Sequence, residues 1–498
     1  MRANRKDVCQ NCRSRKLACD GTQPACSQCT LRGFQCNGYR QEFLFVPQSS
    51  SKIEHQAELT GGKKKYSAHE QKALDNSIHE HTRLATQSKL NSPRGLETMY
   101  FYTLEDDVQF ILQHYAPANG QIPAESNPYH NQICGAWVEI LPLLSTTIME
   151  QQFLLSAIQT LASALRHHTI GSVMCEPQPQ ILKMYCDSIR QMGKALEEAQ
   201  GTFQIEHITA IMCLAVTDIM IPTGEFGWMT HVKGVGELAE RLGPEPFSSG
   251  ILHTLFIGFR PLLLISSIIT QQKTFLAQEE WTTTPFRGQS VSIMQMLLNK
   301  ATELPALLER YYSIGDALDT SNFVVVEQLW NDFRKALVKL QEWESLVNTQ
   351  APFPLYWSRP NPESLSPSDR SVFWFRNIMT ANSMTHYWAF QIIIRTHLET
   401  LGRAFVATNT SSKQAPMQAP SESRRSNSVA ALAEMISDSM LYFMQPEMKL
   451  YGPGSTFFTL PTAIKVFQSE RDHYKLQLSR CQQIIDRLAS IGIYFPPT

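Results

Sequence analysis

The chain has 498 residues, of which 43% are hydrophobic and 18% are charged, a composition that excludes a largely disordered protein and allows several domains. The net charge of −1 excludes a protein that is basic along its whole length. The charge is uneven, however, because residues 1–40 contain eight Lys and Arg against two Asp, which gives +6 there and −7 over the remainder. A small basic head therefore precedes a large, mildly acidic body.

The head contains six of the 11 cysteines, with the spacing Cys9-x2-Cys12-x6-Cys19-x6-Cys26-x2-Cys29-x6-Cys36. No export signal is recognisable at the N-terminus, so we expect an intracellular protein whose clustered thiols are metal ligands or catalytic groups rather than disulfides. Six sulfurs complete two four-coordinate zinc sites only if two sulfurs are shared, which predicts a binuclear cluster with two structural Zn²⁺ ions per chain. A segment of about 40 residues has too small a core to fold without such metal binding.

The head resembles the fungal Zn2Cys6 binuclear cluster DNA-binding domain. The resemblance rests on the cysteine spacing and on the runs Cys9-Gln-Asn-Cys12-Arg-Ser-Arg-Lys-Leu-Ala-Cys19-Asp-Gly and Pro24-Ala-Cys26-Ser-Gln-Cys29. It implies that Cys9 and Cys26 bridge two zinc ions, with Cys12 and Cys19 completing one site and Cys29 and Cys36 the other. It also implies that double-stranded DNA is the partner and that Lys16 reads a guanine of a CGG triplet in the major groove.

The two halves of the duplicated cysteine motif differ in charge. The segment after Cys12 carries Arg13, Arg15 and Lys16, whereas the segment after Cys29 carries only Arg32. We therefore expect the first half to face DNA, with Lys16 at a base edge and the two arginines at phosphates. Many members of the family have a lysine where this chain has Ala18, so one phosphate contact is expected to be missing. The alternative is a merely solvated basic face, which a zinc scaffold directly behind it disfavours.

Residues 46–100 read as a flexible linker, because they lose hydrophobic periodicity and contain Ser-rich, Gly-Gly and Lys-Lys-Lys runs. A short helix is predicted between His69 and Leu84. The family often dimerises through a coiled coil at this point, but residues 41–66 show no sustained heptads. A homodimer and its half-site spacing therefore stay open at this point.

Residues 101–498 are predicted to form a large α-helical domain, which makes the fold class all-α. Apolar residues recur at helical spacing in three segments, at Phe153, Leu154, Ile158, Leu161 and Leu165; at Ile181, Tyr185, Ile189, Met192 and Leu196; and at Leu329, Phe333, Leu337 and Leu340. Residues 372–401 and about 470–491 are predicted to be further helices, 352–369 a proline-rich loop and 407–428 a disordered loop. Arg260 and Pro261 interrupt the longest apolar run, so no membrane-spanning helix is expected.

The body resembles the fungal-specific transcription factor domain that follows many such clusters. The matching pieces are Trp228-x2-His231-x2-Gly234-x3-Leu238-x4-Gly243 and Phe275-Leu276-Ala277 with Trp281 and Pro285-Phe286. His231 is interpreted as a buried histidine, since no second metal ligand lies at helical spacing from it. No motif of a phosphate-binding loop or a nucleophile elbow occurs, so no catalytic residue is predicted. The five cysteines outside the head are interpreted as small buried hydrophobic residues.

The sequence thus predicts a nuclear, zinc-dependent, sequence-specific regulator of RNA polymerase II transcription, with residues 1–45 as the DNA-binding domain. Resembling proteins often control metabolic gene clusters and contact the transcription machinery or co-regulators. One alternative is a helical metabolite-binding sensor or enzyme-like domain that the zinc cluster anchors to DNA. Another is a cytoplasmic zinc-buffering protein, against which the basic segment argues.

Overall fold

A computed structural model describes residues 12, 19, 26–32, 102–117, 134–169, 179–224, 227–314, 323–351, 353–361, 371–409, 428–491 and 493. The predicted helix at 69–84 and nearly all of the predicted loop at 407–428 lie outside these residues. Residues 48–106 form a separate unit, of which only 102–106 are described. In the head, the structure describes one short helix, α2 (Ser27–Leu31).

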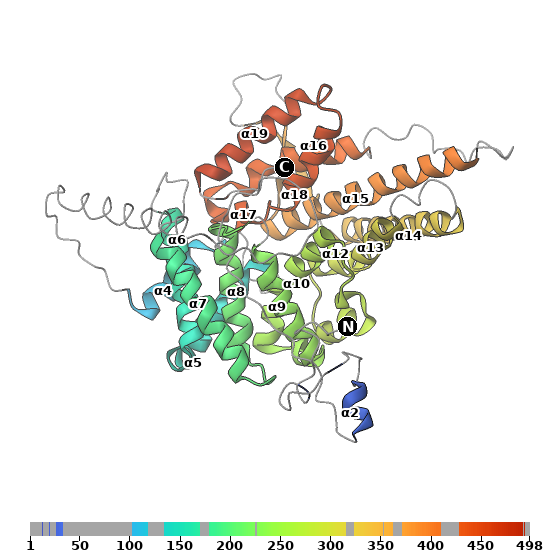
Figure 1. Cartoon of the computed structure of the whole chain (residues 1–498). Coiled ribbons are helices and arrows are strands. Elements are labelled where there is room, and N and C mark those ends of the chain that lie inside the picture. Colours follow the sequence, from blue (N-terminus) through green and yellow to red (C-terminus); the bar gives the residue numbers. More distant parts are fainter. Residues whose placement is uncertain are drawn as a thin grey trace, which may run out of the picture. The chain divides into compact units, whose positions relative to one another are not determined.

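The first part of the body is a group of helices in which α6, α7 and α9 pack against α8 (Figure 1). The elements are α4 (Leu104–His114), η6 (Cys134–Leu144), α5 (Ser145–Glu150), α6 (Gln152–Thr169), α7 (Pro179–Glu198), α8 (Ile205–Met220) and α9 (Gly227–Leu242). All five apolar residues predicted for the face of α6 are buried. On α7, Ile189 is only half-buried and Ser188 takes a buried place, because its hydroxyl bonds those of Ser156 and Thr160 on α6.

The apolar helix α10 lies at the centre of the body and contacts η6, α8, α9, α12 and α13. The elements of this part are η7 (Glu245–Ser248), α10 (Gly250–Thr270), η8 (Phe275–Ala277), α11 (Glu279–Thr283), η9 (Thr284–Phe286), α12 (Ile293–Ala301) and α13 (Leu304–Ile314). By length and composition α10 could cross a membrane, but 67% of its most apolar window is buried inside the structure, as in a core helix. Arg260 and Pro261 lie within this helix and do not end it.

Gln295 of α12 explains how α10 continues through Pro261. A proline has no N–H, so the carbonyl of Ile257 loses the donor that a helix normally supplies. The Nε2 of Gln295 donates to that carbonyl at 3.3 Å. The Oε1 of the same side chain accepts from Nη1 of Arg260 at 2.9 Å, and both side chains are fully buried. One side chain therefore satisfies two buried groups of a neighbouring helix.

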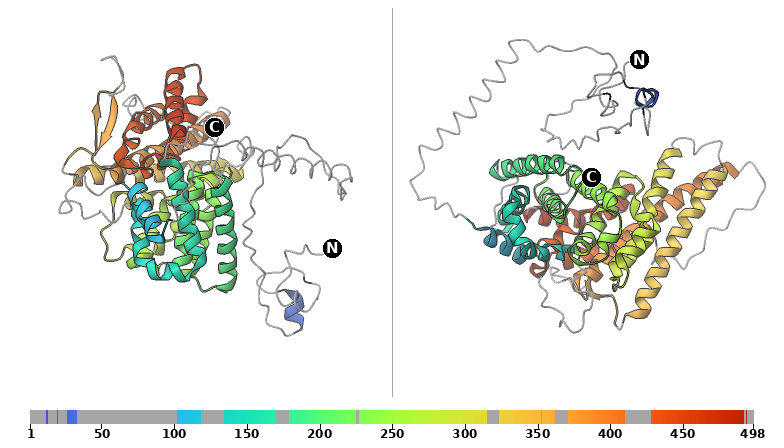
Figure 2. Two further views of the ribbon diagram at one scale, coloured as in Figure 1. Left: turned by 90° about the vertical axis from the view of Figure 1, so that its left-hand side faces the viewer. Right: turned by 90° about the horizontal axis from the view of Figure 1, so that it is seen from below.

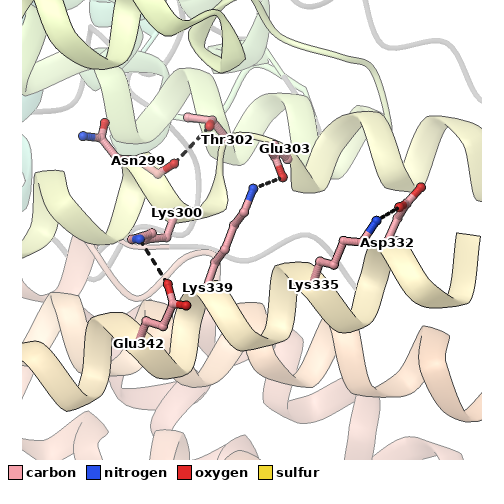
Figure 3. Close-up of polar contacts among 8 residues, drawn as sticks. All are labelled: Asn299, Lys300, Thr302, Glu303, Asp332, Lys335, Lys339 and Glu342. Atoms are coloured by element: carbon pink, nitrogen blue, oxygen red, sulfur yellow. Dashed lines mark hydrogen bonds and ion pairs between the residues drawn. The ribbon is translucent and has the colours of Figure 1, made fainter.

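The long helix α14 (Phe323–Gln350) lies along α12 and α13. Figure 3 shows exposed ion pairs there, with Lys300 to Glu342 at 3.4 Å and Lys339 to Glu303 at 2.7 Å. Such exposed pairs contribute little, roughly 0–1 kcal/mol each. The stronger attachment is Trp343, which is buried and donates from Nε1 to the carbonyl of Ile293 at 3.0 Å.

The C-terminal part adds a short strand pair and the last helices. The elements are β1 (Tyr356–Arg359), β2 (Val372–Phe375), α15 (Ile378–Asn409), α16 (Val429–Phe443), η11 (Pro446–Met448), α17 (Tyr451–Gly454), α18 (Thr459–Ser469) and α19 (Lys475–Ser490). The two strands pair antiparallel, with Tyr356 opposite Phe375, and stand out as two arrows in the left view of Figure 2. They are the only sheet among the residues described.

The prediction of helix from residue 372 was wrong for its first residues. Val372–Phe375 is a run of β-branched and aromatic residues, a composition that favours a strand. The helix begins later because Asn377 caps it, with Oδ1 accepting from the backbone N–H of Thr380 at 2.8 Å. The all-α fold class is nevertheless confirmed, since the strand pair is small beside the helices.

We predict that Gln295→Leu destabilises the body by about 3 kcal/mol, because it removes the side-chain acceptor of Arg260 Nη1 and the donor to the Ile257 carbonyl. Adding Pro261→Ala should recover about 1 kcal/mol of this loss, since alanine restores the N–H that Ile257 needs. Urea unfolding of the single and double variants measures both effects.

The matched control is Gln341→Leu at an exposed position of α14, which should change stability by less than about 0.5 kcal/mol. If Pro261→Ala gave no recovery in the Gln295→Leu background, Gln295 would not be the substitute donor for Ile257.

Candidate metal centre

The structure describes part of the predicted metal and DNA site. Of the six clustered cysteines, Cys12, Cys19, Cys26 and Cys29 are described and all four are buried. Cys9, Cys36, Arg13, Arg15 and Lys16 lie outside the described residues. The described part of the site therefore includes four of the six sulfurs.

Three of the sulfurs converge. The Sγ atoms of Cys12, Cys26 and Cys29 all lie within 4.8 Å of one another, although 14 residues separate the first two. The Sγ atoms of Cys12 and Cys26 are 3.7 Å apart. Two sulfurs bound tetrahedrally at about 2.3 Å from one zinc ion lie about 3.8 Å apart, whereas a disulfide would hold them at about 2.05 Å. The separation therefore fits metal ligands of a shared ion.

The start of α2 positions two of these sulfurs. Cys26 is the N-cap residue, and its Sγ accepts a hydrogen bond from the backbone N–H of Cys29 at 3.4 Å. Its carbonyl accepts from the N–H groups of Cys29 and Thr30, both at 3.1 Å. Cys26 and Cys29, with two residues between them, thus lie at the start and the end of the first turn of α2. This turn brings both sulfurs to the same end of the helix, and the N–H donor favours a negatively charged sulfur there.

The burial and the chemistry of these cysteine thiols also suit zinc. Cys26 is fully buried and Cys29 is 2% exposed, so the sulfurs face inward in a segment with few apolar residues to cover them. Thiolate sulfurs are the preferred ligands of structural zinc sites, which have no open position for a substrate. Zinc bound here would supply folding free energy, and these cysteines would hold it. Cys19 is buried too, but it lies outside the set of three convergent sulfurs.

The body contains a cluster whose residue types resemble those of catalytic sites. The hydroxyl of Tyr185 lies between Nε2 of His231 and the carboxylate of Asp218, which also accepts from Thr223 at 2.6 Å. His231 is 3% exposed, and burial lowers its pKa to about 4, so the imidazole is neutral at pH 7. The interpretation of His231 as a buried histidine is confirmed. The cluster ties α7, α8 and α9 together in the core.

The scattered cysteines divide into two groups. Cys213 and Cys481 are buried, as predicted for small hydrophobic residues, whereas Cys134 and Cys186 are half-buried. Cys175 lies outside the described residues. Sequence reasoning missed that Cys134 lines a cavity, because the surrounding residues come from elements far apart in the chain.

We predict that Cys26→Ser weakens zinc binding but keeps α2 capped, because a serine hydroxyl accepts from the Cys29 N–H yet is a poor zinc ligand. Cys26→Ala loses both functions and should be the more damaging change. Competition for zinc between the full-length chain and a chelator gives the order of affinities.

Thr30→Val is the control, since it removes the hydrogen bond from Thr30 Oγ1 to the Cys26 carbonyl without touching a sulfur. Equal zinc affinity of wild type and Cys26→Ala would contradict the assignment of Cys26 as a ligand.

Comparison with known proteins agrees with this geometry. Residues 7–44 match the family described as the fungal Zn(2)-Cys(6) binuclear cluster domain, and this match includes all six clustered cysteines. No curated protein and no solved structure matches the chain. The matched family is one of zinc-dependent DNA-binding transcription factors and not of enzymes. The head is therefore a zinc-binding domain of the type found in DNA-binding transcription factors.

Proposed function

We propose that the chain is a sequence-specific regulator of RNA polymerase II transcription that acts in the nucleus. In this proposal residues 1–45 bind DNA, residues 46–100 are a linker, and residues 101–498 form a regulatory body of the fungal-specific transcription factor type. The observation that carries the proposal is the convergence of the Cys12, Cys26 and Cys29 sulfurs inside a segment that matches the cluster family. A metabolic gene cluster as the target, contacts with co-regulators and a homodimer are finer parts of the same proposal.

The proposed metal content is two Zn²⁺ ions held by six cysteines, with Cys9 and Cys26 bridging. Four ligands per zinc require eight sulfur contacts, and two shared sulfurs provide them. The convergence of the Cys12, Cys26 and Cys29 sulfurs within 4.8 Å of one another supports this assignment, in which the Cys26 sulfur is shared. In the proposed arrangement Cys12 and Cys29 belong to different zinc ions.

We predict two zinc ions per chain, measured by elemental analysis of the purified full-length protein. Cys26→Ser should reduce the content toward zero, because a bridging sulfur serves both ions. Substituting a terminal ligand, as in Cys12→Ser, should be no more damaging. A wild-type stoichiometry of one would contradict the shared-sulfur arrangement.

The proposed DNA surface is the first half of the cysteine motif. The described part of the second half, residues 26–32, supports this choice. Here α2 ends at Leu31, whose side chain is 80% exposed, and Arg32 caps the helix as the one cation of these residues. A phosphate backbone is bound mainly by clustered Lys and Arg. The first half supplies such a cluster in Arg13, Arg15 and Lys16. We propose that Lys16 donates to O6 and N7 of guanine in a CGG-type triplet and that the arginines bind phosphates.

We predict that Lys16→Ala and Arg13→Ala weaken DNA binding in different ways. Lys16→Ala should cost about 1–3 kcal/mol on a CGG site and much less on scrambled DNA, because it removes a base contact. Arg13→Ala should weaken both DNAs alike and reduce the slope of log K against log salt by about one. Binding isotherms of the full-length chain across a salt series measure both.

The two variants are matched controls for each other, since each removes one positive charge. Equal weakening of both DNAs by Lys16→Ala would make Lys16 a phosphate contact and remove the support for CGG recognition. Failure of the wild-type chain to prefer any DNA sequence in a site-selection experiment would reject sequence-specific regulation.

A further inference from the structure

The helical body contains a cavity of about 80 Å³. Residues of α8, α10, α15 and the chain around α17 line it, together with Trp137 and Cys134 of η6. A cavity of this size admits a small organic molecule. Several lining residues, among them Ile219, Leu262 and Phe457, are only half-buried, so solvent reaches the cavity.

The wall of the cavity is predominantly apolar, with Val216, Ile265 and Met294 among its residues. An apolar cavity does not by itself hold water well, since each water needs several polar partners. An apolar molecule would instead gain from the removal of its surface from water. The composition of the wall therefore favours an organic ligand.

One buried polar atom in this wall has no partner. Asn382 on α15 is 5% exposed and lines the cavity, and its Oδ1 makes no hydrogen bond. The Nδ2 of the same amide donates to the hydroxyl of Tyr451 in a long bond of 3.4 Å. A buried acceptor without a donor is rare in folded proteins because its desolvation is not compensated. A ligand with one donor would satisfy it.

The polar groups around the cavity are uncharged at pH 7. Burial lowers the pKa of His386 to about 4, and its Nδ1–H donates to the carbonyl of Asn382 at 2.8 Å. Burial raises the pKa of the Cys134 thiol to about 12 and raises that of the Tyr451 hydroxyl well above its ordinary value. The wall therefore offers no charged side chain to pair with an ionic ligand, since the other polar side chains that line it include only those of Asn382, Tyr115 and Ser455.

We infer that this cavity binds a small, uncharged, mainly apolar molecule that places one hydrogen-bond donor on Oδ1 of Asn382. The ligand class is that of phenols and compact alcohols. This site is separate from the proposed DNA contacts, so its test does not depend on DNA binding.

The experiment titrates the full-length, zinc-loaded chain by calorimetry with three probes that share one ring and one ethyl group. 4-Ethylphenol carries a donor, 4-ethylanisole carries an oxygen without a donor, and 4-ethylbenzoate carries a charge. We expect 4-ethylphenol to bind about tenfold more tightly than 4-ethylanisole, the effect of one hydrogen bond to a buried acceptor, and 4-ethylbenzoate not to bind.

Variants then assign the binding to the cavity. Asn382→Leu should bring the two neutral probes within twofold of each other, because it removes the acceptor at nearly constant volume. Ile265→Trp should abolish binding of both by filling the space. Asn331→Leu, half-buried on α14 and outside the cavity, is the matched control and should leave the tenfold preference unchanged.

A thermal transition shows whether Asn382→Leu folds. If it does not fold, the affinities of the three probes for the wild-type chain test the inference on their own. Equal affinities of the phenol and the anisole would overturn the inference, and so would an absence of saturable binding by 4-ethylphenol. Binding of 4-ethylbenzoate as tight as that of the phenol would also overturn it.

Discussion

The helical body depends on enclosing α10, a helix that is apolar on nearly every face. Such a helix is stable only if other elements cover it on all sides, and η6, α8, α9, α12 and α13 do so. Two glycines allow the close approach that this cover requires. A Cβ on Gly258 would lie 2.9 Å from Trp137 Cβ, and one on Gly236 would lie 2.7 Å from Leu263 Cδ2. The cavity remains where these covering elements do not fill the space beside α10.

The head and the body are stabilised by different physics. The body buries whole faces of long helices, with tryptophans such as Trp137, Trp281 and Trp388 almost fully enclosed. The described part of the head has no comparable core, and its buried residues are cysteines. Conditions that remove metal should therefore act on the head, whereas changes in apolar packing should act on the body.

The sequence allowed the buried face of a helix to be predicted where only apolar residues at helical spacing are buried. The five residues of α6 show this, whereas α7 departs from it because Ser188 is buried through hydroxyl hydrogen bonds that an apolar pattern does not register. The strand at Val372–Phe375 was missed because a short apolar run is compatible with either a strand or a buried helix. The cysteine spacing predicted the convergence of Cys12, Cys26 and Cys29, since metal ligation restricts geometry strongly. The cavity could not be predicted, because its wall joins residues from Tyr115 to Ile493.

The pairing of Pro261 and Arg260 with Gln295 has a consequence for how this sequence can change over evolutionary time. Nη1 of Arg260 donates to Gln295 and Nη2 to Asn299, while Gln295 also serves the carbonyl that Pro261 leaves without a donor. Replacing Arg260, Gln295 or Asn299 alone leaves a buried polar group without its partner, so a stepwise path passes through a less stable intermediate. These positions should be inherited together as a block, while surface pairs such as Lys300 and Glu342 drift independently.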